Sequence, residues 1–342
     1  MKRFLPSLTL AVALAASCAQ PKAPQTDRLQ VIFETDLGND VDDALALDLL
    51  YKYQDQGLID ILAIMINKNG TAPAEYADIM NTWYGHQVPI GIIVNGAECE
   101  NDGVNYAKVV AEMKDDAGEP VFERSGIDLS TLPEAHILYR ELLAGAADKS
   151  VNIVSVGFST NLSRLLDSPA DEISSLTGRE LVAAKVAMLY TMAAHMTDTT
   201  FREYNVVKDV AAAKNVFEDW PTPITNSSFE VGAEILYPAT SIENDFGWAP
   251  QHPLVEAYKS YLPMPHDRPC WDPTALLYAV EGERFFGLSE PGSLRVNPDG
   301  SVVYEPSEDG TFRYITVTDE QRAAIKQHFV EMITSVPAKY RK

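Results

Sequence analysis

Five short apolar runs rich in β-branched residues recur along the chain. They cover residues 29–33, 59–66, 88–94, 151–156 and 186–189. Each run is nearly continuous rather than alternating between apolar and polar positions, which is typical of strands that are buried on both faces of a sheet. The pattern therefore predicts a set of buried strands.

Segments with helical spacing and polar outer faces separate these runs, at residues 43–53, 74–84, 132–147 and 209–217. Strands that alternate with helices in this way predict an α/β fold with an open, mostly parallel sheet flanked by helices, in a single domain. Towards the end, residues 301–304 and 312–317 predict a hairpin around Asp309-Gly310, and a final helix is expected from Thr318. Ligands of such sheets bind beyond the carboxyl ends of the strands.

The first residues are typical of an export signal. Lys2 and Arg3 precede a mostly apolar stretch, and small residues close it at Cys18. This end resembles a bacterial lipobox, in which the cysteine is lipidated, although an ordinary cleaved signal with an incidental cysteine is the alternative. We predict a signal peptide over residues 1–18, a tether over 19–28 and the folded domain over 29–342. The protein is then exported, periplasmic or at the cell surface, and touches a membrane only through a lipid anchor at Cys18.

The charge balance narrows the class of ligand. The chain has 27 Lys and Arg residues against 49 Asp and Glu residues, a net charge of −22. No basic stripe is present that could displace the counterions of a nucleic acid, so a small neutral ligand or a bound cation fits better. Cys99 and Cys270 leave open whether one disulfide forms. Whether the protein is a homo-oligomer is also open.

The clearest chemical feature is an acidic loop directly after the first predicted strand. Five carboxylates stand within ten residues, and a helix begins at once: Glu34, Asp36, Asp40, Asp42 and Asp43. Such a group needs a cation or shifted pKa values, and ligands that are all oxygen favour Ca²⁺ or Mg²⁺. One or two aspartates at a helix start are explained by capping, but five are not.

This loop resembles the aspartate signature of the inosine-uridine-preferring nucleoside hydrolase family, Asp-x-Asp-Pro-Gly-x-Asp-Asp. Asp36, Gly38 and the Asp42-Asp43 pair fit it. Glu34 replaces the first aspartate, Leu37 replaces proline, and the loop is two residues longer. The longer loop leaves open whether Asp40 or Asp42 contacts the sugar, and the place of Asp42 at the helix start favours Asp42.

Three further segments match the family in order. Residues 156–162 resemble its Thr-Gly-Pro-Leu-Thr-Asn loop, in which the residue before glycine offers a backbone carbonyl to calcium. Residues 203–205 resemble the Glu-Phe-Asn stretch that holds ribose hydroxyls, and Trp271-Asp272 resembles the late His-Asp pair. Asn69 is the expected ribose-contacting asparagine after the second strand, with Asn67 as the alternative.

The resemblance implies calcium-dependent hydrolysis of the N-glycosidic bond of ribonucleosides, which releases base and ribose. A metal ion would acidify and position a water, and Asp36 would take its proton as the base. The implied metal ligands are Asp36, Asp43, Asp272 and the carbonyl of Val156. The implied substrate-binding residues are Asp42, Asn69, Glu203, Asn205 and Trp271.

Two other functions deserve comparison. Haloacid-dehalogenase-like phosphatases also place Asp-x-Asp after a first strand, but their nucleophilic aspartate is replaced here by Glu34. A calcium-dependent nucleoside- or ribose-binding lipoprotein with impaired catalysis is the second alternative, because Trp271 stands where the family often has histidine. His266 is the nearest histidine in sequence to Asp272 and a candidate for the missing acid. Purine or pyrimidine preference cannot be read from the sequence.

Overall fold

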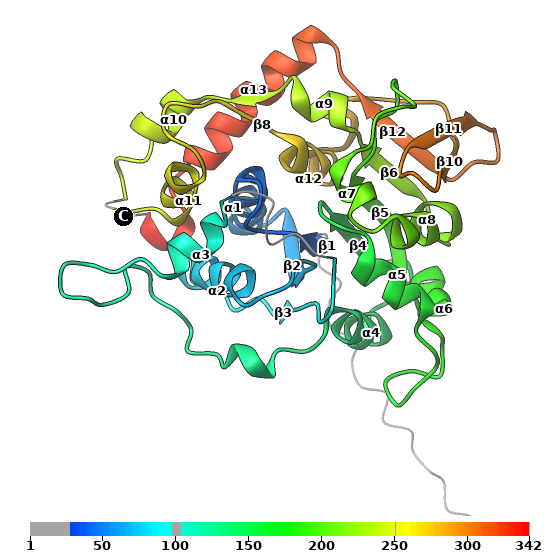
Figure 1. The fold of residues 1–342 in the computed structure, drawn as a ribbon, viewed down its shortest axis with the longest axis horizontal. Helices are drawn as coiled ribbons and strands as arrows, with labels where there is room; N and C mark the ends of the chain where they lie inside the picture. The colour runs from blue at the N-terminus through cyan, green and yellow to red at the C-terminus, as the bar shows by residue number, and fades with distance from the viewer. Residues whose placement is uncertain (1–27, 98–103, 250, 342) are drawn as a thin grey trace, which may run out of the picture.

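The computed structural model describes residues 28–97, 104–249 and 251–341. Its centre is a ten-stranded sheet in the order β11-β10-β12-β6-β5-β4-β1-β2-β3, with β9 paired to β12 (Figure 1). The strands are β1 (Leu29–Thr35), β2 (Ile59–Ile66), β3 (Ile90–Gly91), β4 (Val151–Ser155), β5 (Val186–Met192), β6 (Ile224–Ser227), β9 (Gly287–Leu288), β10 (Gly292–Val296), β11 (Val302–Pro306) and β12 (Phe312–Thr316). A separate two-stranded sheet pairs β7 (Leu236–Tyr237) with β8 (Arg268–Pro269).

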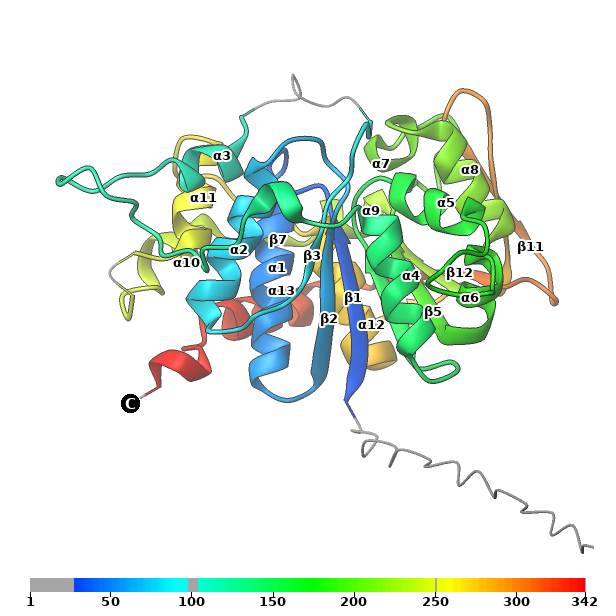
Figure 2. The same ribbon diagram turned by 90° about the horizontal axis from the view of Figure 1, so that it is seen from below.

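Helices cover both faces of the sheet, and Figure 2 shows α1 and α2 on one side of the upright β1 and β2 and α4 and α5 on the other. The α-helices are α1 (Asp42–Asp55), α2 (Ala72–Tyr84), α3 (Tyr106–Ala111), α4 (Ala135–Gly145), α5 (Thr160–Asp167), α6 (Gly178–Lys185), α7 (Tyr204–Val207), α8 (Val210–Asp219), α9 (Phe229–Ala233), α10 (Ala239–Asn244), α11 (Pro253–Tyr261), α12 (Trp271–Glu281) and α13 (Asp319–Thr334). Short 3₁₀ turns lie at Leu129–Thr131, Gly282–Arg284 and Ala338–Tyr340.

Strand β1 lies in the middle of the parallel part, between β4 and β2. Its side chains alternate between two cores: Val31 and Phe33 enter the core beneath α1, and Ile32 enters the core beneath α4 and α5. A strand buried on both faces in this way needs an almost continuous apolar sequence, as predicted. The expected open, mostly parallel α/β architecture in one domain is confirmed.

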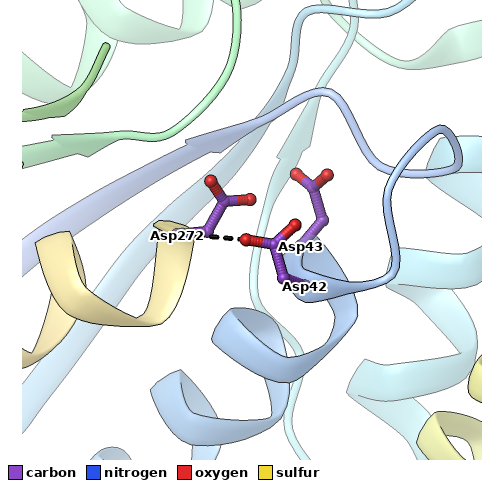
Figure 3. A group of neighbouring side chains, drawn as sticks. All are labelled: Asp42, Asp43 and Asp272. Carbon is purple, nitrogen blue, oxygen red and sulfur yellow. Dashed lines mark hydrogen bonds between the residues drawn. The ribbon is translucent and has the colours of Figure 1, made fainter. Parts of the chain in front are cut away.

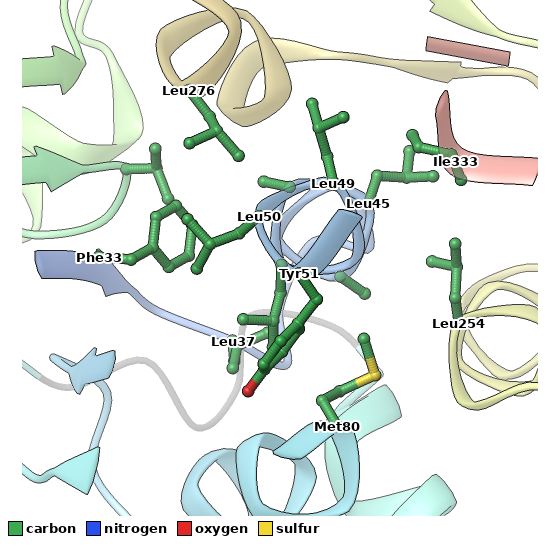
Figure 4. Close-up of a cluster of buried hydrophobic side chains, with 14 of the residues drawn as sticks. Phe33, Leu37, Leu45, Leu49, Leu50, Tyr51, Met80, Leu254, Leu276 and Ile333 are labelled. Atoms are coloured by element: carbon green, nitrogen blue, oxygen red, sulfur yellow. The ribbon is translucent and has the colours of Figure 1, made fainter. Parts of the chain in front are cut away.

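Helix α1 is enclosed by the protein on all sides. Residues 42–53 are all buried, and Figure 4 shows Leu45, Leu49 and Leu50 packed between side chains of other elements, among them Phe33, Leu276 and Ile333. Full burial of one such leucine side chain contributes about 1.5–3 kcal/mol. The predicted polar outer face of this helix is therefore wrong, because Asp48 and Lys52 are buried as well. The packing holds the first turn of α1, and thus Asp42 and Asp43, in a fixed place.

The predicted hairpin is also wrong. Strand β11 pairs with the preceding β10 in antiparallel register, around a turn at Asp299-Gly300, whereas β12 lies parallel to β6 on the other side of β10. Both turns contain Asp-Gly, but the hairpin forms around Asp299-Gly300 and not around the predicted Asp309-Gly310. Strand β12 takes the inner position, where Phe312 and Ile315 are buried.

Most remaining element predictions agree with the structure within a few residues. Strand 88–94 is the exception, because only Ile90–Gly91 pairs as a strand. Among the described residues, no helix is long and apolar enough to cross a membrane. The predicted signal peptide, residues 19–27 of the tether, lipidation at Cys18 and the Cys99 half of a disulfide lie outside the described residues. Cys270 is buried and has no disulfide partner among the described residues.

Candidate functional site

A cavity of about 320 Å³ lies beyond the carboxyl ends of β1, β4 and β5, a volume within the range of small-molecule sites. Its floor and walls combine carboxylates with aromatic side chains. The lining residues are Asp36, Asn39, Asp40, Asp42, Asp43, Val156, Met192, Phe201, Arg202, Glu203, Tyr204, Asn205, Phe229, Tyr261, Trp271 and Asp272. All the predicted site residues within the described part of the chain line it, except Asn69.

Three buried carboxylates form the densest group in this cavity. Asp42, Asp43 and Asp272 each offer one oxygen atom, and these atoms lie within 4.8 Å of one another. Figure 3 shows them coming from the first turns of α1 and α12, whose N-termini converge. The backbone N–H of Asp272 donates to Asp42 Oδ2 at 3.0 Å, and the Thr35 hydroxyl donates to Asp43. Two helix N-termini stabilise negative charge at this point.

Burial and mutual repulsion govern the protonation of this group. Desolvation raises the pKa of Asp42, Asp43 and Asp272 well above the usual range, and the neighbouring carboxylates raise these pKa values further. Burial also raises the pKa of Asp36 to about 7, although the positive charge of Lys68 opposes that rise. A divalent cation would relieve this repulsion. The donors are oxygen atoms, so the residues present fit Ca²⁺ or Mg²⁺.

The geometry separates the two candidates for the sugar-binding aspartate. Arg268 donates from Nε to Asp40 Oδ1 at 2.7 Å and from Nη2 to Asp40 Oδ2, so Asp40 is held in a bidentate ion pair. Asp42 instead lies beside Asp272 in the carboxylate group. Both carboxylates line the cavity, but only Asp42 belongs to the cluster that could hold a cation. The group of three neighbouring carboxylates thus contains Asp42. The predicted metal ligand Asp36 lines the same cavity but lies outside this group.

Glu203 and Asn205 are held rigidly at the start of α7. The Glu203 carboxylate accepts from the backbone N–H groups of Ala194, Asn205 and Val206 at 3.0 to 3.2 Å, and burial raises its pKa. The Asn205 amide donates to the carbonyl of Val156 at 2.9 Å. A carbonyl oxygen has two lone pairs, so that of Val156 keeps one for a cation.

The asparagines after β2 do not reach the cavity. Asn67 donates to Glu34 and to the carbonyl of Phe158 in the buried interior. Asn69 donates to the carbonyls of Gly96 and Ala97. Neither lines the cavity, so the structure does not bring the predicted Asn69 to the site. Lys68, between them, contacts the cavity residue Asn39 instead.

Aromatic side chains wall the rest of the cavity. Trp271 stacks on Phe229 with ring centroids 5.3 Å apart, and its indole Nε1–H donates to the Phe229 carbonyl at 2.9 Å. Phe201 also packs on Phe229, with ring centroids 4.6 Å apart. The Arg268 guanidinium lies over both Trp271 and Tyr261, 5.1 and 5.0 Å from the ring centroids. Flat apolar surfaces of this kind suit a planar heterocycle.

No histidine lines the cavity within the described ranges 28–97, 104–249 and 251–341. The candidate acid His266 stacks on Tyr258 at 4.4 Å between ring centroids, and its Nε2 lies 3.2 Å from the Tyr258 carbonyl. Glu34, at the position of the phosphatase nucleophile, is buried and accepts from Tyr139 and Asn67. The sequence did not predict the cavity residues Asn39, Tyr204, Phe201, Phe229 and Tyr261, since only tertiary packing brings them to the cavity.

Comparisons with known proteins agree with this geometry. The fold is similar to that of the plant nucleoside hydrolase PpNRh1, with a TM-score of 0.68 and 17% identity, covering 90% of this chain and 99% of that one. A purine-preferring ribonucleoside hydrolase from Gardnerella vaginalis gives a TM-score of 0.67 at 15% identity, covering 89% and 98%. An inosine-uridine preferring nucleoside hydrolase from Bacillus anthracis gives 0.62 at 15%, covering 89% and 99%.

At these identities the likenesses show the fold alone. No curated protein matches by sequence. The family model described as inosine-uridine preferring nucleoside hydrolase, however, matches residues 31–338, which include the whole cavity. The chain therefore belongs to the inosine-uridine preferring nucleoside hydrolase family.

Proposed function

We propose that this protein hydrolyses the N-glycosidic bond of ribonucleosides in the cavity at the carboxyl ends of the strands, and that the reaction depends on Ca²⁺. One observation carries the proposal. The buried cluster of Asp42, Asp43 and Asp272 shares one cavity with Asp36 and with several aromatic side chains. The cluster suits a cation and the hydroxyls of a sugar, and the aromatic walls suit a base.

Different residues of the cavity bind the sugar and act on the attacking water. A Ca²⁺ ion, when bound, would supply Lewis acidity at the site of the attacking water. Asp36 would take the proton of the attacking water as the general base. Asp36, Asp43, Asp272 and the carbonyl of Val156 would hold the ion, and Asp42 stands close enough to Asp43 and Asp272 to contribute as well.

The ribose hydroxyls are bound by Asp42, Glu203 and Asn205. Glu203 and Asn205 are fixed by backbone hydrogen bonds, so their side chains do not need to reorder when the substrate binds. Deoxyribonucleosides are rejected because a missing hydroxyl leaves buried polar partners without a hydrogen bond.

A nucleoside-binding protein with impaired catalysis is the second candidate, and one observation favours it. The Trp271 N–H is already bound to the carbonyl of Phe229, and indole has no proton to release at neutral pH. Departure of a natural base then lacks help from this residue. The two candidates differ in turnover but share calcium-dependent binding.

A panel of ribosides tests the proposal. The solved relatives are named for inosine, guanosine, purine or uridine preference, so the panel holds inosine, guanosine, uridine and 2′-deoxyinosine. We expect hydrolysis of ribosides to stop after exhaustive chelation and to return with Ca²⁺. Asp272→Asn should abolish it, while Asp245→Asn at an exposed position should not. Full activity in chelated protein contradicts the metal assignment, and calcium-dependent binding without turnover decides for the second candidate.

A further inference from the structure

Lys68 is a buried cation at the carboxylate site. It lies two residues beyond the end of β2 and is only 4% exposed. Its Nζ donates to the side-chain oxygen of Asn39. A Cβ atom placed on Gly38, whose φ is +118°, would lie 3.4 Å from this Nζ, so the ammonium packs directly beneath the turn of the acidic loop.

The charge of Lys68 reaches the proposed metal ligands. Its buried Nζ contacts Asn39 and lies beneath Gly38, and these two residues stand in the acidic loop between Asp36 and Asp42. An ammonium group that is taken out of water costs free energy unless its surroundings compensate it, and here the carboxylates do so. The same positive charge must repel a divalent cation that binds to these carboxylates.

Lys68 also fixes the orientation of an amide on the cavity wall. An ammonium group only donates hydrogen bonds, so the oxygen of Asn39 has to face Lys68. The Asn39 Nδ2 then faces the opposite way and donates to the Tyr204 hydroxyl at 2.7 Å. Asn39 and Tyr204 both line the cavity. An amide nitrogen carries two hydrogens, and the second can serve an acceptor on a bound substrate.

Asn39 belongs to the part of the loop that is longer than the family signature. Its neighbour Asp40 is tied to Arg268, which packs on Trp271 and Tyr261. The longer loop is thus held at both residues, because Asn39 is bonded to Lys68 and Tyr204 and Asp40 is paired with Arg268. This fastening makes Asn39 a fixed part of the cavity wall.

We propose that Lys68 is a positioning residue with two effects: its charge weakens the binding of Ca²⁺ by the carboxylate cluster, and its hydrogen bond aims the Asn39 amide at the bound substrate. The inference rests on the proposed function, because it assumes that the cluster binds a cation. Lys68 itself does not line the cavity. It acts through Asn39 and through its charge.

Calorimetric titration of the chelator-treated protein with Ca²⁺ tests the effect of charge. Lys68→Met and Lys68→Gln both remove the positive charge, and we expect each to bind Ca²⁺ about tenfold more tightly than wild type, which corresponds to about 1.4 kcal/mol. Lys68→Arg keeps the charge and should stay within about threefold of wild type. A residue that only supported the fold would weaken binding when replaced, so tighter binding is specific to the proposal.

Steady-state kinetics with the best riboside tests the effect on orientation. Asn39→Ala should raise KM about tenfold, the size expected for one lost hydrogen bond, with an unchanged Ca²⁺ affinity. Lys68→Gln still offers a donor to Asn39, so its KM should stay near wild type. Lys68→Met loses the donor, and its KM should rise as in Asn39→Ala.

Lys52 provides the matched control. It is also a buried lysine, 2% exposed, but it lies on α1, binds the carbonyl of Ser335 and does not line the cavity. Lys52→Met should leave the Ca²⁺ affinity unchanged. If Ca²⁺ binds to folded Lys68→Gln and Lys68→Met no more tightly than to wild type, the role proposed for Lys68 is wrong and the proposed function is unaffected. Wild-type protein that binds no Ca²⁺ contradicts the proposed function and removes the inference with it.

Discussion

At the scale of single residues, Trp271 is the side chain that most separates this site from the family pattern. The family often has a histidine before the late aspartate, and a histidine can protonate or orient the departing base. Trp271 presents a ring face next to Phe229, and its only N–H is held by a backbone carbonyl. It can stack on a base but cannot release a proton to it.

We therefore expect the rate to depend steeply on how well the base leaves. A general acid contributes about 10²–10⁴-fold to such a step, so kcat/KM for p-nitrophenyl riboside should exceed that for inosine or uridine by at least about 100-fold. Trp271→His should narrow this ratio, and Trp271→Phe, which keeps an aromatic face, should preserve it. Equal kcat/KM values for the activated and natural substrates in wild type would reveal an acid elsewhere in the site.

Some site residues could be predicted from the sequence and others could not. Asp36, Asp42 and Asp43 were predictable because a strand end, a glycine turn and a helix start fix them locally. The run Asn67-Lys68-Asn69 was not, because successive residues after a strand point in different directions and a shift of one residue changes which side chain faces the site. Only the packed structure shows that Lys68 turns towards the acidic loop and Asn69 away from it.

At the scale of elements, α1 joins the site to the interior. Its first turn carries Asp42 and Asp43, and its middle carries Asp48, which is 0% exposed. The Tyr84 hydroxyl donates to Asp48 Oδ1 at 2.6 Å, and the Nε2 of buried His252 lies 3.7 Å from the same oxygen. Burial raises the pKa of Asp48 to about 6, although the charge of Lys52 opposes this rise.

This raised pKa predicts a pH-dependent stability with a definite sign. The unfolded chain releases the Asp48 proton near pH 4, and the folded protein holds it until about pH 6. The contribution to stability is complete below about pH 4 and is lost as the pH rises to about 6, by roughly 3 kcal/mol at most. Asp48→Asn, neutral at every pH, should therefore gain stability relative to wild type between pH 4 and pH 7. Urea unfolding at both pH values measures this difference, and the exposed variant Asp245→Asn should show none.

Some strands of the sheet could be predicted from the sequence, whereas the pairing of others could not. The central strands β1, β2, β4 and β5 can be predicted from the sequence, because burial on both faces requires a continuous apolar sequence. The pairing of β10, β11 and β12 depends on competition between strands that are close in sequence, and Asp-Gly occurs in both connecting turns. The turn residues alone therefore do not determine that β12 is the strand that pairs with β6.

At the scale of the whole molecule, sheet topology assembles a site from residues more than 230 positions apart, such as Asp36 and Asp272. The parallel strands bring their carboxyl ends to one edge, and α12 returns to place Asp272 against the start of α1. A chain with a net charge of −22 concentrates six carboxylates in one cavity. A divalent cation bound by these carboxylates would stabilise the fold by a free energy that grows with the logarithm of the free ion concentration.

The place where the protein works belongs to the same scale. We propose that it is exported and anchored by a lipid at Cys18, from the basic start, the apolar stretch and the small residues that end at this cysteine. An extracytoplasmic location would expose the site to free Ca²⁺ at far higher concentrations than the cytoplasm offers. A single acyl chain gives only marginal membrane binding, so stable anchoring requires the several chains of a lipoprotein.

Cell fractionation tests this proposal. Wild-type protein should partition with membranes and enter the detergent phase, because several acyl chains together bind a bilayer far more firmly than one. Cys18→Ser removes the thiol that would carry the lipid and should release the protein or leave its signal unprocessed. Cys99→Ser removes a thiol outside the proposed signal segment and should partition as wild type does, which separates lipidation from a general effect of cysteine loss. Mass spectrometry of the mature N-terminus completes the test, and wild-type protein that is soluble with an unmodified N-terminus decides for an ordinary secretory signal.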